Sequence, residues 1–168
     1  MEVLLGKTLE ELQTIAQEVG LQRFAGKQLA EWLYVRRATS FDEMTNISLK
    51  GREALKARYT IGRHAPVAEA ISKDGTKKYL FRVSNSEAVY IESVYIPDDD
   101  RATLCVSTQA GCKMGCKFCM TGTLGFHGHL TAADILNQIF SIPDADKLTN
   151  GEWIATPKFD AINTFFGN

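Results

Sequence analysis

The chain has 168 residues, of which 45% are hydrophobic and 10% aromatic, and its formal net charge is -1. A chain of this length and composition buries a hydrophobic core, which excludes a disordered tail and a miniature domain held together only by disulfides. No apolar stretch approaches the length of a membrane-spanning helix, and the N-terminus lacks the pattern of a signal peptide. We therefore expect a cytoplasmic monomer without a membrane segment.

The first part of the chain predicts a small helical module. Thr8 and Glu11 form a capping box at the start of a helix, and Gly20 is placed to end it. Apolar residues at helical spacing predict further helices over residues 25–35 and 48–59, the latter with a serine as its N-cap.

The period then changes to two. Residues 77–83 and 88–96 are rich in Tyr, Phe, Val and Ile, and the polar residues 84–86 between them are typical of a turn. This pattern predicts a β-hairpin, which Pro97 ends. The aspartates at 98–100 are typical of a solvated turn rather than of a metal site.

The next region predicts one βα unit, as in parallel α/β folds. Residues 102–108 form the strand and residues 109–130 a glycine-rich loop, and a capping box of Thr131 and Asp134 opens a helix that Pro143 ends. Catalytic loops lie at the C-terminal ends of strands in such folds. The predicted apolar face of the helix comprises Ile135, Leu136, Ile139 and Phe140.

All four cysteines of the chain lie in this region, and Cys112, Cys116 and Cys119 have the spacing C-x3-C-x2-C. In a reducing cytosol such clustered thiols favour metal binding over structural disulfides. Three cysteines suit a 4Fe-4S cluster that keeps one iron open, as in radical S-adenosylmethionine (SAM) enzymes. A zinc loop is the alternative, and an inert thiol cluster is a further one. Zinc would need a fourth ligand from Cys105, His127 or His129.

Longer stretches, among them "GTKKYLFRV", "IESVYIP" and "CVSTQAGCKMGCKFCMTGTLGFHGHLTAADILNQ", make residues 4 to 150 closely resemble the N-terminal half of the RlmN/Cfr family. The resemblance implies a radical SAM methyltransferase that methylates C2 of adenine in 23S rRNA and tRNA through a methyl-cysteine intermediate. It also implies SAM and a 4Fe-4S cluster as cofactors, with an electron donor such as flavodoxin. Phe118 is implied to contribute to cofactor binding.

Two more residues match family positions. Cys105 corresponds to the cysteine that resolves the protein–RNA adduct through a transient disulfide, and Glu92 to the carboxylate that accepts the C2 proton. The residues themselves allow simpler interpretations, because free cysteine is often a small buried hydrophobe and a lone strand glutamate usually faces water. Strand alternation places Leu104 and Val106 on one face and Cys105 on the other, so packing of the apolar face on helices would point Cys105 into the barrel.

Basic residues between positions 36 and 64 predict an RNA surface. Seven lysines and arginines lie there against three acidic residues, and they would neutralise phosphates while Trp32, Tyr34 and Tyr59 stack on bases. Charges on helical faces that serve only solubility are the simpler alternative.

These interpretations combine into an α/β chain with an all-helical accessory domain, a β-hairpin connector and the first βα unit of a partial (β/α)6 barrel. The family's later βα units, its glycine-rich SAM motif and its C-terminal methyl-carrying cysteine are missing from the sequence, so we expect a truncated or frameshifted, inactive form. The alternatives are a non-catalytic RNA-binding module with a zinc-stabilised cysteine loop and a different radical SAM activity. The predicted domains are 1–62 (helical, RNA-binding), 63–100 (connector), 101–150 (start of the barrel) and 151–168 (atypical tail).

Overall fold

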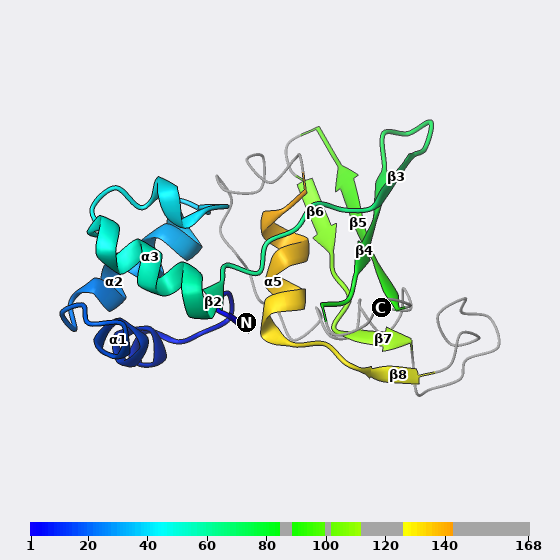
Figure 1. Cartoon of the computed structure of the whole chain (residues 1–168). Helices are drawn as coiled ribbons and strands as arrows, with labels where there is room; N and C mark the ends of the chain where they lie inside the picture. Colours follow the sequence, from blue (N-terminus) through cyan, green and yellow to red (C-terminus); the bar gives the residue numbers. More distant parts are fainter. Residues whose placement is uncertain (85–88, 100–101, 112–125, 143–168) are drawn as a thin grey trace. The chain divides into compact units, whose positions relative to one another are not determined.

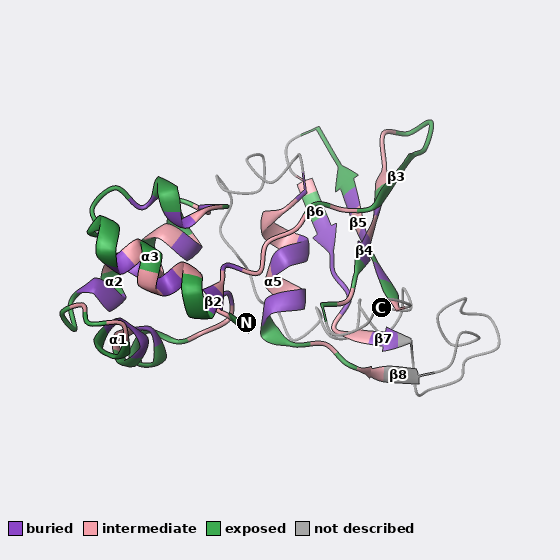
Figure 2. Ribbon diagram, viewed as in Figure 1, coloured by how far each residue is buried: buried purple, intermediate pink, exposed green. Residues whose placement is uncertain are grey.

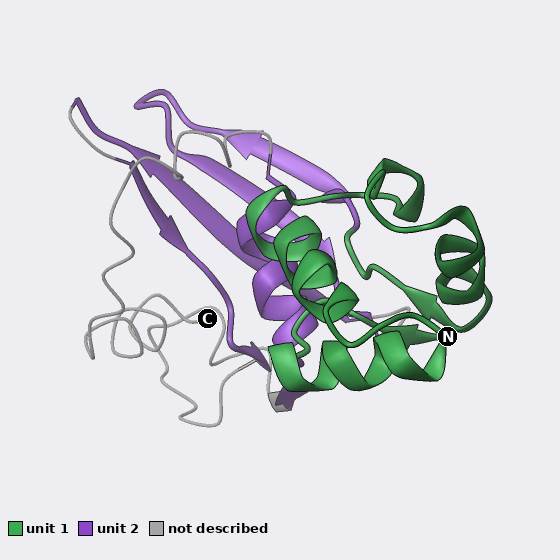
Figure 3. Cartoon of the chain, turned by 90° about the vertical axis from the view of Figure 1, so that its left-hand side faces the viewer, with its two compact units in different colours: residues 1–63 green, residues 64–168 purple. Residues whose placement is uncertain are grey.

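The computed structural model describes residues 1–84, 89–99, 102–111 and 126–142 (Figure 1). The chain divides into two compact units, one formed by residues 1–63 and one that begins at His64 (Figure 3). Each unit is described below by itself. Among the described residues, no helix has both the length and the apolar character needed to cross a membrane.

The first unit is mainly helical, as the sequence predicts, but it also contains a short parallel strand pair that the sequence did not indicate. The predicted second helix is α-helical at its start and continues as a π-helical turn, η1. Its elements are β1 (Glu2–Val3), α1 (Leu9–Glu18), α2 (Ala25–Ala30), η1 (Glu31–Val35), η2 (a 3-10 turn, Phe41–Glu43), α3 (Leu49–Arg58) and β2 (Tyr59–Thr60), with β1 and β2 paired in parallel.

Local capping explains where these helices begin and end. The Thr8 hydroxyl accepts a hydrogen bond from the Glu11 N–H at 3.3 Å, and the Glu11 carboxylate accepts one from the Thr8 N–H at 2.6 Å. The predicted capping box is therefore confirmed, as is the Ser48 N-cap, whose hydroxyl accepts from Gly51. Gly20, after α1, adopts a φ of 80° that favours glycine.

The core of the first unit is apolar. Leu12, Leu29 and Leu33 are fully buried, and α1 packs closely on α2 because Gly26 has no side chain. A Cβ atom at Gly26 would lie 2.6 Å from the Cα of Gln13, so this close approach excludes larger residues.

The second unit contains a four-stranded antiparallel sheet in the order β3-β4-β5-β6. The strands are β3 (Ala68–Ile71), β4 (Lys77–Arg82), β5 (Tyr90–Pro97) and β6 (Ala102–Cys105). The predicted hairpin is confirmed as β4 and β5. Strand β3 was missed because all of its residues are exposed, and it therefore lacks the alternation that reveals a strand.

The predicted βα unit needs two corrections. The region expected to be one loop from 109 to 130 starts and ends with paired strands, β7 (Gln109–Gly111) and β8 (Phe126–His129). The strand that precedes it, β6, ends at Cys105 rather than at residue 108, and it pairs antiparallel with β5, a neighbour that the predicted unit did not include. The helix is confirmed as α5 (Ala132–Phe140), and its capping box of Thr131 and Asp134 is present.

The buried face of α5 also differs from the prediction. Ile135 and Ile139 pack against the apolar core of the sheet, but the predicted apolar residues are all only half-buried. The most buried positions form an adjacent stripe along the helix (Figure 2): Ala133, Asp134, Asn137 and Gln138. Three of these four residues are polar, so hydrophobic periodicity alone placed the face incorrectly.

Candidate functional site

Two predicted site residues lie on the same face of the sheet. Cys105 in β6 is directly opposite Val94 in β5, and residues opposite each other in an antiparallel pair point to the same face. Val94 and Glu92 are two residues apart and also share a face. Cys105 and Glu92 are therefore diagonal cross-strand neighbours, a relation that typically separates Cα atoms by about 7–8 Å.

The opposite face of these strands packs on the helix. Leu104 is opposite Tyr95, and the neighbouring Ser93 hydroxyl bonds to a side chain of α5. The register thus places Leu104 and Cys105 on opposite faces of the sheet, as the sequence suggested. Exposure would not reveal this difference, because both residues are buried.

Cys105 is a buried thiol, with 4% of its surface exposed. Burial raises the pKa of this thiol above its ordinary value of 9.0, because the thiolate would lose its hydration. At neutral pH the group is therefore held as the unreactive thiol.

Glu92 lies at the surface. Its side chain is 48% exposed, and one carboxylate oxygen lies 3.5 Å from Nζ of Lys78 on the adjacent strand. Glu92 is therefore accessible to solvent and lies beside a cation of the adjacent strand.

The remaining predicted ligands follow directly in the sequence. Cys112, Cys116, Cys119 and Phe118 lie outside the described residues, and so does the side chain of His127. The two ends of this segment are held together, because Gln109 is paired with His129 and Ala110 with Gly128. The chain therefore leaves and re-enters the described fold at one place, just after the strand that carries Cys105.

Sequence reasoning missed a buried polar network between α5 and the sheet. Each carboxylate oxygen of Asp134 accepts two hydrogen bonds. Oδ1 accepts from the N–H and the hydroxyl of Ser84, and Oδ2 accepts from the N–H and the hydroxyl of Thr131. Asn137 accepts a hydrogen bond from the N–H of His64 at 2.9 Å. The i, i+3, i+4 spacing of Asp134, Asn137 and Gln138 was the available signal, but only the partners reveal its meaning.

Burial and hydrogen bonding have opposite effects on Asp134. Burial alone would raise the pKa of this carboxyl, but the hydrogen bonds from Ser84 and Thr131 favour the carboxylate and lower the pKa below its ordinary value of 3.8. The α5 N-terminus is therefore anchored by a charged group.

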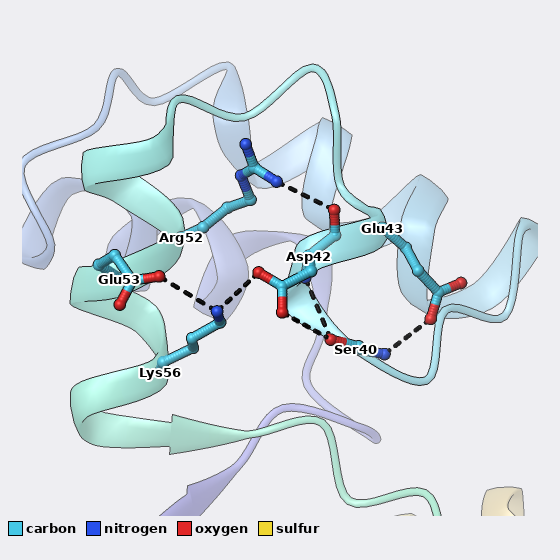
Figure 4. Close-up of polar contacts among 6 residues, drawn as sticks. All are labelled: Ser40, Asp42, Glu43, Arg52, Glu53 and Lys56. Atoms are coloured by element: carbon cyan, nitrogen blue, oxygen red, sulfur yellow. Dashed lines mark hydrogen bonds and ion pairs between the residues drawn. The ribbon is translucent and has the colours of Figure 1, made fainter.

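The basic segment of the first unit is largely engaged within the protein (Figure 4). Nζ of Lys56 lies 2.6 Å from a carboxylate oxygen of Asp42 and 3.1 Å from one of Glu53, and the guanidinium of Arg52 donates to the Asp42 carbonyl. These contacts engage two of the seven basic side chains with partners inside the first unit. Lys50 and Arg58 are exposed on α3 and remain candidates for phosphate contact.

The aromatic residues proposed to stack on bases differ in exposure. Tyr59 is 6% exposed and donates its hydroxyl hydrogen to Glu18, so the prediction that it stacks on RNA is wrong. Tyr34 bridges Gly6 and the carbonyl of Lys7 through its hydroxyl. Trp32 is half-buried, and the guanidinium of Arg36 lies 4.6 Å from a ring centroid of its indole.

An open cavity of about 280 Å³ lies within the first unit, lined among others by Thr39, Lys56 and Arg63. Arg63 donates to the carbonyl of Arg37, a residue with a left-handed φ of 55°. Burial, and then the nearby charge of Arg37, lower the pKa of Arg63. Arg37 and Arg63 thus contact each other within the first unit.

Comparisons with known proteins relate this chain to RNA methyltransferases. Residues 3–61 match the family described as the ribosomal RNA large subunit methyltransferase N-terminal domain. The chain is 60% identical over 147 residues to a protein of Bacteroides fragilis described as a probable dual-specificity RNA methyltransferase RlmN, which covers 88% of this chain and 42% of the relative. It is 45% identical to the RlmN of Geotalea uraniireducens, over 85% of this chain and 41% of that protein.

A solved structure has the same fold. The crystal structure of a radical SAM methyltransferase from Sphaerobacter thermophilus matches with a TM-score of 0.74 and 35% sequence identity, over 83% of this chain and 41% of that one. The chain spans about two-fifths of the length of the curated relatives it matches.

Proposed function

We propose that this chain, which belongs to the RlmN family over the N-terminal part that it shares with its relatives, acts in radical SAM methylation of RNA, with C2 of adenine in 23S rRNA and tRNA as the target. One observation carries the proposal: Cys105 and Glu92 lie on one sheet face, directly before a three-cysteine segment whose ends are paired.

The donor set fits a 4Fe-4S cluster. Cys112, Cys116 and Cys119 would supply three thiolates, and a cluster with three protein ligands has an iron free for a further ligand. When bound, this group would supply the one-electron cleavage of SAM that yields the radical, with an electron donor such as flavodoxin. Phe118 would lie beside this cofactor.

Cys105 and Glu92 have separate proposed tasks. In the family, a methyl-carrying cysteine near the C-terminus, beyond the part that this chain matches, becomes linked to the RNA. The sulfur of Cys105 would form a disulfide with that cysteine and release the RNA, while the Glu92 carboxylate would accept the C2 proton. Burial of Cys105 favours its protonated form, so a change in its surroundings would have to precede the attack of its thiolate.

Anaerobic reconstitution with iron and sulfide, followed by EPR of the reduced chain with and without SAM, tests the proposal. We expect a 4Fe-4S signal that SAM changes and that Cys116→Ala abolishes. Cys105→Ala is the matched control, because it removes a thiol from the strand but no proposed ligand of the 4Fe-4S cluster, and should retain the signal. Stoichiometric zinc without a cluster would instead support the non-catalytic RNA-binding module.

A further inference from the structure

We propose that Gln138 is a positioning residue of this site. Its carboxamide holds β5 and the segment after β6 in the register that places Cys105 and Glu92 on one face of the sheet. The functional importance of that face depends on the proposed function, but the positioning itself does not.

The carboxamide of Gln138 is completely buried and fully hydrogen-bonded. Its oxygen accepts hydrogen bonds from the Ser93 hydroxyl at 2.7 Å and from the Ser107 N–H at 2.8 Å. Its nitrogen donates to the Ser107 carbonyl at 2.8 Å and to the Asp134 carbonyl at 3.2 Å. A side-chain amide thus binds both backbone groups of Ser107, as a residue of a neighbouring strand would.

These contacts lie where the strand pairing ends. The last paired residues of β5 and β6 are Val94 and Cys105, and Ser107 follows two residues later. The Ser107 hydroxyl donates to the carbonyl of Glu92 at 2.7 Å. Gln138 therefore ties together Ser93, which is next to Glu92, and Ser107, which is two residues from Cys105.

Register decides which face carries the thiol. A slip of one residue between β5 and β6 would move Cys105 to the opposite face. The same slip would leave the buried carboxamide and the Ser107 backbone without their partners, which is strongly unfavourable in a buried site. The three directional hydrogen bonds from Gln138 to Ser93 and Ser107 thus penalise the slip more selectively than apolar packing alone would.

Asn137 offers a matched control on the same helix. It is 1% exposed, and its amide contacts His64 and Ser141 rather than the strands that carry Cys105 and Glu92. Gln138→Met and Asn137→Leu each remove one buried amide from the same helix face, but only the first removes the contacts to Ser93 and Ser107.

The experiment follows Cys105 directly. In the full chain with Cys112, Cys116 and Cys119 replaced by serine, Cys105 is the only thiol. Its alkylation by iodoacetamide and the hydrogen exchange of the Ser107 amide are measured under native conditions, and global stability is measured by denaturant. We expect Gln138→Met to accelerate both by about tenfold more than its global stability explains, the size expected for lost buried hydrogen bonds. Asn137→Leu should change both only as far as its global stability requires.

Ser93→Ala provides a milder test if Gln138→Met does not fold, because it removes only one of the donors to Gln138. It should accelerate alkylation by about threefold, as for one hydrogen bond of modest net strength. A Gln138→Met or Ser93→Ala effect no larger than that of Asn137→Leu at matched stability would overturn the proposal. The alkylation experiment needs no iron. A failed cluster reconstitution would therefore contradict the proposed function without affecting the test of Gln138.

Discussion

Two helices of this chain begin with the same capping box but bury different chemistry. In α1, the box of Thr8 and Glu11 is exposed, and the buried face is apolar, with Leu12 at its centre. In α5, the box of Thr131 and Asp134 is part of the interface with the sheet. Apolar burial is non-directional, whereas hydrogen bonds require particular partners. Apolar packing therefore holds α1 in place, whereas α5 is held by apolar packing and by directional hydrogen bonds.

The largest expected effect comes from the apolar helix. Leu12→Ala should lower the free energy of unfolding of the first unit by about 3 kcal/mol, because it leaves a cavity in a fully buried site. Leu9→Ala is the matched control on α1, since Leu9 is 42% exposed, and it should cost well under about 1 kcal/mol. Hydrogen exchange of the α1 amides in increasing denaturant measures both. Equal losses would contradict the assignment of the buried face.

Removal of the buried cap should have the next largest effect. Asp134→Ala leaves the donors of Ser84 and Thr131 without their acceptor, which should destabilise the second unit by about 2–3 kcal/mol. Glu11→Ala removes the equivalent group from α1, and we expect a smaller loss because water can replace the exposed carboxylate. Exchange of the amides of each helix reports the two losses separately. A Glu11→Ala loss as large as that of Asp134→Ala would show that burial of the box is unimportant.

Acid should weaken the polar interface selectively. The pKa of Asp134 in the folded chain lies below its ordinary value of 3.8, so its stabilising contribution is fully present above that value and is lost as the pH falls through the lower, folded pKa. Below about pH 4, the unfolding free energy of the native chain should therefore fall more steeply with pH than that of Asp134→Asn. Denaturant titrations from pH 7 to pH 2 test this. Parallel curves would refute the charged anchor.

A smaller effect is expected at the end of α1. Gly20→Ala should cost about 1 kcal/mol because the φ of 80° disfavours a side chain. No atom outside its immediate neighbours lies within 4 Å of the added Cβ, so the cost is conformational rather than steric. Denaturant unfolding measures it, and Gly20→Asn, which tolerates this conformation better, should recover part of the loss.

The surface pair beside Glu92 should matter least for stability. Lys78 and Glu92 are about half exposed, and such pairs contribute about 0–1 kcal/mol. Lys78→Ala should change the unfolding free energy of the second unit by less than about 0.5 kcal/mol. Lys77→Ala on the same strand serves as a comparison. A loss of several times this size would indicate that Glu92 holds the sheet together, which would weaken its assignment as a reactive group.

The local signals predicted much of the fold. Each cap acts within four residues, so Thr8 with Glu11, Ser48, and Thr131 with Asp134 could all be recognised without tertiary information. Alternation revealed the β4–β5 hairpin. Strand β3 escaped because both of its faces are exposed. The proposal that Tyr59 stacks on bases failed because its ring is buried in the first unit's core, together with Leu55 four residues earlier.

The candidate site shows the same division. The spacing of Cys112, Cys116 and Cys119 is a chemical signal that is complete within the sequence. The shared face of Cys105 and Glu92 follows from pairing between two strands, and the role of Gln138 from hydrogen bonds to residues 31 and 45 positions away. No pattern within one segment can show such a relation.

The sequence by itself therefore determined the helix starts, the hairpin, the cysteine spacing that predicts a metal site and the family resemblance, because each depends on residues close together in the chain or on their identity alone. The tertiary structure decided the antiparallel setting of β6, the polar face of α5 and the common face of Cys105 and Glu92. These depend on strand register and on buried polar groups finding partners far along the chain, and burial makes those partners obligatory.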